Sequence, residues 1–196
     1  MNAAVIATTF GIVFLAELPD KTALASLVLA TRYRAQYVFA GAAAGFAVQV
    51  VLALVAGALL ALLPHRTLEA IVAALFLLGA VLIFRHGRDE AQEAEHVAQE
   101  AKPGRGPWRA VLTSFTVITV AEFGDLTQIV TANLAAKYDW LSVGVGALVA
   151  LWAVAALAIL GGQALLRVIP LKLITRAAAL IMAALAALSL IAAIRG

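Results

Sequence analysis

Cysteine is absent from this chain of 196 residues, and charged residues make up only 13% of it. Without cysteine the protein has no disulfide bond, no thiolate metal site and no cysteine nucleophile. Ordinary soluble domains are about half apolar and about a quarter charged, whereas 64% of these residues are hydrophobic and the mean hydropathy is +1.02. A soluble domain of this length could not bury so much apolar surface, so the composition predicts an integral membrane protein.

A large excess of charge of one sign is also missing. Lys and Arg number 14 and Asp and Glu number 11, which gives a net charge of +3 and a calculated isoelectric point of about 9.6. The basic residues are dispersed and form no stripe, unlike those of a nucleic-acid-binding surface. We therefore expect the lipid bilayer and small ions as partners, and no nucleic acid.

Long apolar runs fill most of the chain. A helix that crosses the ~30 Å hydrocarbon core of a bilayer needs about 20 mostly apolar residues. The runs are rich in Ala, Leu and Val without alternating polar residues, which favours helices over the strands of a barrel. The predicted fold class is therefore all-α integral membrane, with six transmembrane helices at residues 3–30, 37–63, 67–84, 109–136, 140–166 and 172–194.

Lysine and arginine are divided unevenly between the loops on the two sides of these spans. Ten lie in or beside the loops of one side, and the other side carries three, Arg66, Lys137 and Arg195. Because positive residues mark the cytoplasmic side, both termini are expected outside the cytoplasm. The first run lacks a basic n-region and is interrupted by Glu17 and Asp20, so we expect a retained span and not a cleaved signal peptide.

The sequence partly repeats itself after a shift of 105 residues. Matching residues occur in the runs and in the loops, and they include Glu17 with Glu122, Asp20 with Asp125, Thr22 with Thr127, Tyr33 with Tyr138 and Gly41 with Gly146. Each copy has three spans, an odd number, so the second copy must enter the membrane from the opposite side. This pattern predicts two inverted repeats, an architecture typical of transporters.

The repeats define the expected domain organisation. The first three-helix repeat covers 1–84, a cytoplasmic charged linker covers 85–108, and the second repeat covers 109–196. A solvated linker is the simpler interpretation of the middle segment. The alternative is a metal-sensing or docking segment that uses His86 and His96. Because one chain holds both repeats, we expect a monomer to suffice, with a homodimer as the alternative.

Two acid pairs lie near the middle of the first and fourth predicted spans, Glu17 with Asp20 and Glu122 with Asp125. An ionised acid at that depth costs about 2.5–3.5 kcal/mol, so it must face an interior or a cavity. Residues three apart share one helix face. Inverted repeats can therefore bring both pairs together as one cluster of four carboxylates.

Each pair contains a residue that favours a break in the helix. Pro19 removes a backbone donor and Gly124 frees its own backbone. A broken helix would release carbonyl groups as further ligands.

Four carboxylates at close range cannot all remain ionised without counter-charge. A divalent cation, protons or Lys21 can supply it, and competition between metal and protons is the physical basis of exchange. Oxygen ligands, with no Cys and no intramembrane His, favour Ca²⁺, Mg²⁺ or Mn²⁺ over Zn²⁺ or Cu⁺.

Neutral side chains near the acids are candidates for completing the metal's ligand shell. Thr22, Thr127 and Gln128 follow the acids closely in the sequence. The alternative for these three is hydrogen bonding between helices, which is common in membranes. For Gln49 and Asn133 this alternative is the favoured interpretation.

Two other classes of protein must be weighed against a transporter. An intramembrane aspartic protease needs only two carboxylates that share a proton, whereas this chain has two symmetric pairs of Glu and Asp. No H-E-x-x-H pattern or Ser/His arrangement is present. A structural scaffold would leave four buried acids unexplained. We therefore expect a transporter, not an enzyme, with no prosthetic group.

The acid-containing stretches resemble the paired E-x-G-D-(K/R)-(T/S) motifs of the Gdt family of membrane cation transporters, also called uncharacterised protein family 0016. The stretches read Glu17-Leu18-Pro19-Asp20-Lys21-Thr22 and Glu122-Phe123-Gly124-Asp125-Leu126-Thr127. Pro19 stands where the first motif has Gly, and Leu126 where the second has a basic residue. The resemblance covers nearly the whole chain.

The resemblance implies transport of Mn²⁺ or Ca²⁺ coupled to protons, and in bacteria the export of Mn²⁺ through the inner (plasma) membrane. It carries the metal-site role to Glu17, Asp20, Glu122 and Asp125, with Thr22 and Thr127 as the motif hydroxyls. Mn²⁺ export in exchange for protons is the favoured expectation, and Ca²⁺/H⁺ exchange is the alternative.

Overall fold

The computed structural model describes residues 1–18, 21–86, 106–168 and 171–195. Within these ranges the chain forms eight α-helices and no strand, which confirms the prediction of an all-α fold. The helices are α1 (Ala3–Glu17), α2 (Lys21–Arg32), α3 (Ala35–Leu60), α4 (His65–His86), α6 (Pro107–Ala121), α7 (Leu126–Lys137), α8 (Trp140–Val168) and α9 (Leu171–Arg195).

The span predicted over 109–136 is two helices and not one. Helix α6 ends at Ala121 and α7 begins at Leu126. Between them Gly124 adopts φ +78°, a left-handed conformation that glycine reaches without a Cβ penalty. The predicted break at Gly124 is therefore confirmed.

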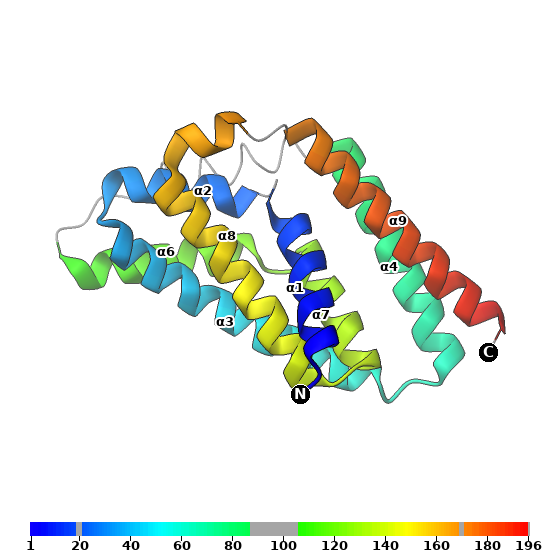
Figure 1. Ribbon diagram of the computed structural model, residues 1–196. Coiled ribbons are helices and arrows are strands. Elements are labelled where there is room, and N and C mark those ends of the chain that lie inside the picture. Colours follow the sequence, from blue (N-terminus) through cyan, green and yellow to red (C-terminus); the bar gives the residue numbers. More distant parts are fainter. Residues whose placement is uncertain (19–20, 87–105, 169–170, 196) are drawn as a thin grey trace.

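The span predicted over 3–30 likewise contains the separate helices α1 and α2, which run in clearly different directions (Figure 1). Pro19 and Asp20, between these helices, lie outside the described residues.

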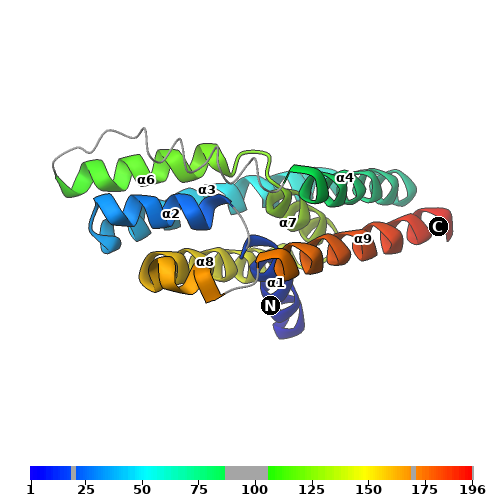
Figure 2. The same ribbon diagram turned by 90° about the horizontal axis from the view of Figure 1, so that it is seen from above.

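Helices from the two halves of the sequence pack against each other. Helix α1 packs on α8, and α3 packs on α6 and α7. Helices α4 and α9 form a close pair at one side of the molecule, while α2, α6 and α8 gather at the other (Figures 1 and 2). This intermixing places the break between α6 and α7 near the end of α1.

Two of the described helices are long and apolar enough to cross a membrane, Ala35–Leu60 and Trp140–Gly161. The stretches Ala3–Glu17 and Ala183–Ile194 are apolar but shorter. Large apolar side chains such as Val55 and Leu160 remain 54% and 79% exposed, as expected of surfaces that contact lipid. These features support a membrane protein, and the six crossings remain a prediction.

The N-terminus is held against the start of α8. The backbone N–H of Asn2 donates to Ser142 Oγ at 2.7 Å, and the hydroxyl and backbone N–H of Ser142 both donate to Asp139 Oδ2. These hydrogen bonds lower the pKa of the Asp139 carboxyl below its usual value. The N-terminus and the beginning of α8 therefore lie at the same face of the molecule, which we call the N-terminal face.

Candidate metal centre

Three of the four acids predicted to share a site converge at the helix breaks. Glu17 is the last residue of α1, Glu122 is the C-cap of α6, and Asp125 is the N-cap of α7. One carboxylate oxygen from each lies within 4.8 Å of the other two. Glu17 and Glu122 are 0% and 2% exposed, and Asp125 is half-buried. The fourth acid, Asp20, and the side chain of Lys21 lie outside the described part of the chain.

The two predicted motif hydroxyls both contact a carboxylate. Thr22 Oγ1 donates to Glu17 Oε1 at 2.8 Å, and Thr127 Oγ1 lies 3.4 Å from Asp125 Oδ2. The backbone N–H of Thr127 also donates to Asp125 Oδ2, at 3.3 Å, and so caps α7. Both threonines are buried. In these positions the hydroxyls orient the carboxylate groups.

Gln128, predicted beside the site, holds the helix break in place. Its Oε1 accepts from the backbone N–H of Gly124 at 3.0 Å, and its Nε2 donates to Gln49 Oε1 at 2.7 Å. Gln49 Nε2 in turn donates to the Thr119 carbonyl at 2.7 Å. Gln49 therefore makes the interhelical hydrogen bonds expected of it, and Gln128 uses its amide in the same network.

Replacing Gln49 with Leu is expected to destabilise the protein by about 1–2 kcal/mol, because the Gln128 amide and the Thr119 carbonyl lose their buried partner. The loss should appear as a lower midpoint of thermal unfolding in detergent. Val48→Leu, at the neighbouring 39% exposed position, serves as the control. Equal unfolding midpoints for the two variants would contradict the network.

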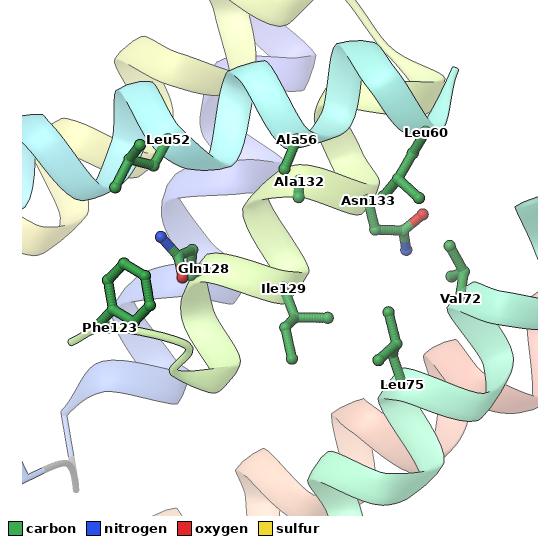
Figure 3. A pocket seen from close by; sticks show the side chains of 10 residues that line it. All are labelled: Leu52, Ala56, Leu60, Val72, Leu75, Phe123, Gln128, Ile129, Ala132 and Asn133. Atoms are coloured by element: carbon green, nitrogen blue, oxygen red, sulfur yellow. The ribbon is translucent and has the colours of Figure 1, made fainter. Parts of the chain in front are cut away.

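The cavity beside the break, of about 320 Å³, does not suit a cation (Figure 3). Its lining comes from α3, α4, α7 and Phe123 in the break before α7, and it is mostly apolar, with Gln128 and Asn133 as its polar members. Apolar side chains cannot replace the water around a divalent ion. The Asn133 Oδ1 atom has no hydrogen-bond partner in the described part of the chain. The carboxylate cluster is the better candidate.

A partly buried ion pair away from the cluster could hardly be predicted from the sequence. Lys137 Nζ lies 2.8 Å from Glu69 Oε1, and Glu69 is 3% exposed. Lys137 also donates to Ser189 Oγ at 3.2 Å. The only sign in the sequence is a carboxylate inside the predicted span 67–84. Lys137 lies in a loop between two predicted spans, so its contact with Glu69 becomes evident only from the packing of α7 against α4.

Comparison with known families decides the class of the protein. A family described as "Divalent cation/proton antiporter GDT1" matches residues 5–91 and 110–196. The chain belongs to this family. Its members are transporters and not enzymes, so the Gdt resemblance and the expectation of a transporter are both confirmed.

Individual relatives of this GDT1 chain come from bacteria and plants. It is 32% identical to "GDT1-like protein sll0615" of Synechocystis over 165 residues, which cover 78% of this chain and 80% of that protein. It is 33% identical to the Vibrio cholerae protein named "Putative manganese exporter", over 72% of this chain and 68% of the relative. "Protein PAM71, chloroplastic" of Arabidopsis thaliana is 30% identical, over 81% of this chain but only 49% of its own length. No solved structure matches the chain.

Proposed function

We propose that this GDT1 chain exports Mn²⁺ in exchange for protons through the carboxylate cluster. The observation that carries the proposal is the approach of Glu17, Glu122 and Asp125 within 4.8 Å, two of them fully buried. Asp20, whose repeat counterpart is Asp125, is the proposed fourth acid. Thr22, Thr127 and Gln128 complete the proposed site. The two threonines lie beside the acids, and Gln128 is hydrogen-bonded to Gly124 in the break between α6 and α7.

The cluster has the chemistry that an exchanger of metal and protons needs. Carboxylates this close repel one another when ionised, so either a divalent cation or protons must balance them. Metal binding requires deprotonated ligands and therefore releases protons. The last carbonyl groups of α1 and α6 add partial negative charge beside Glu17 and Glu122. One site can thus hold the metal or the protons, but not both at full occupancy.

The positions of the helices support two inverted repeats, 1–84 and 109–196, joined by the linker 85–108. Helix α7 (Leu126–Lys137) begins and ends 105 residues after α2 (Lys21–Arg32). The two segments that match the family, residues 5–91 and 110–196, are offset by the same 105 residues at both ends. Two similar halves in opposite orientation can exchange conformations, and this exposes a central site to each side in turn.

The choice of Mn²⁺ over Ca²⁺ rests on chemistry and on the name of one relative. A relative named as a manganese exporter is 33% identical to this chain. Mn²⁺ accepts carboxylate and carbonyl ligands, and the described acids supply three such groups. Ca²⁺ takes six to eight oxygens and is the alternative substrate.

The proposed location is the inner (plasma) membrane. Both termini lie outside the cytoplasm and the linker lies inside it, as the distribution of Lys and Arg indicates. The chloroplastic relatives are longer than this chain, which matches about half of PAM71. A monomer contains both halves of the proposed site.

Proteoliposomes with a trapped pH dye test this proposal. Addition of Mn²⁺ should make the interior more alkaline as protons leave in exchange, and Glu17→Gln or Asp125→Asn should remove the response. Ca²⁺ and Mg²⁺ are added separately under the same conditions. A pH change mainly with Ca²⁺ would identify Ca²⁺, the alternative, as the substrate. No pH change with any of the three metals would contradict exchange of metal for protons.

A further inference from the structure

An ion pair between the buried Glu69 and the partly exposed Lys137 side chain joins α7 to the α4–α9 helix pair. Lys137 is the last residue of α7, Glu69 lies near the start of α4, and Ser189 lies near the end of α9. Lys137 Nζ reaches the Glu69 carboxylate at 2.8 Å and the Ser189 hydroxyl at 3.2 Å. Three helices are therefore joined through one ammonium group.

The ion pair lies at the N-terminal face of the molecule. Lys137 comes two residues before Asp139, whose carboxylate lies 4.0 Å from the amino group of Met1. Next to the pair, Leu68, Val72 and Leu134 are 6%, 1% and 6% exposed and pack in one cluster between α4 and α7. The structure is thus closed between these helices at this face. Val72 also lines the cavity of Figure 3.

The other half of the chain does not repeat two of the three residues of this contact. At the 105-residue offset, Lys137 corresponds to Arg32, the last residue of α2, so both halves carry a basic residue there. Glu69, however, corresponds to Ile174, and Ser189 corresponds to Phe84. The positions equivalent to Glu69 and Ser189 therefore offer Arg32 neither a carboxylate nor a hydroxyl group. The pair therefore breaks the symmetry of the repeats.

We propose that the Glu69–Lys137 pair, supported by Ser189, holds the N-terminal face closed and so sets which face of the transporter opens to the metal at rest. This inference rests on the alternating access of the proposed function. Two symmetric halves would give two conformations of similar free energy, and a contact present in only one conformation shifts that equilibrium. Removing Lys137 leaves the buried Glu69 carboxylate without its partner, and removing the Glu69 charge abolishes the ion pair, so opening becomes easier in either variant.

The absence of cysteine from the chain makes a direct test simple. Val72→Cys places a single reporter at a 1% exposed position, one turn from Glu69 in α4. A membrane-impermeant maleimide is applied to either face of oriented vesicles. Adding Glu69→Gln should raise the labelling rate from the N-terminal face at least about fivefold, the lower range of coupling between two states. Lys137→Met should do the same, and combining the two should add little.

The matched control exchanges the charges, Glu69→Lys with Lys137→Glu, and should return the labelling rate toward that of the reporter alone. Ser189→Ala, which removes one hydrogen bond, should give a smaller increase. In Glu69→Gln without the reporter, the apparent affinity for Mn²⁺ should rise at the N-terminal face and fall at the opposite face. Unchanged labelling, or labelling that rises equally from both faces, would overturn the proposal. Labelling does not depend on transport. If the unsubstituted chain failed to exchange metal for protons, that result would contradict the proposed function and would leave the labelling test of the ion pair intact.

Discussion

Glu122→Gln is expected to abolish metal-driven proton movement, with a fall of at least about 100-fold in the rate. Groups that only support metal ligands change affinity by about 10–100-fold when they are replaced, and Glu122 lies within the cluster itself. Its carboxylate is 2% exposed and within 4.8 Å of oxygens from Glu17 and Asp125. Gln keeps the shape of the side chain but carries no charge and releases no proton.

The measurement compares metal uptake and internal pH in the same proteoliposomes. Glu17→Gln is the matched variant in the other acid-containing stretch, and the double variant should be no worse than either single one, because residues that act as a unit are not additive. Unfolding of each variant in metal-free detergent checks that the protein is intact. Normal exchange by a folded Glu122→Gln protein would remove the central support for the proposed site.

The acids could be found from the sequence because buried charge is costly and the repeat is long. Glu17 and Glu122 lie in the middle of apolar runs, where a carboxylate is costly and therefore indicates a functional site. The 105-residue offset predicts that the two stretches meet, and Gly124 predicts where the second one breaks. Both predictions depend on local chemistry and on the internal repeat, and both of these can be recognised in the sequence alone.

Other features depend on packing and could not be predicted. Gln49 reads as a polar residue inside an apolar run, but its contact with Gln128 joins residues 79 positions apart. The Glu69–Lys137 pair spans 68 positions, and Ile174 stands where the repeat would place the carboxylate of Glu69. Both contacts follow from which helix faces which, and alanine-rich helices offer little periodicity to reveal it.

Gly41→Ala is expected to destabilise the protein by about 3 kcal/mol, at the upper end of the usual cost of overpacking. A Cβ at this position of α3 would meet the Val111 carbonyl, and would lie 2.8 Å from Ser114 Cβ and 2.9 Å from Phe115 N. Two of these three atoms belong to the backbone of α6, so relief requires the two helices to separate.

Gly11→Ala provides the control, since a Cβ on Gly11 of α1 meets nothing within 4 Å. There alanine should be neutral or should stabilise the helix by up to about 1 kcal/mol. Gly146→Ala should resemble Gly41→Ala, because its Cβ would lie 2.6 Å from the Ile6 carbonyl of α1. Thermal unfolding in detergent measures all three variants. Because α6 and α1 carry Glu122 and Glu17 at their ends, the two damaging variants should also weaken Mn²⁺ binding, and a Gly41→Ala protein as stable as Gly11→Ala would contradict the close contact of α3 with α6.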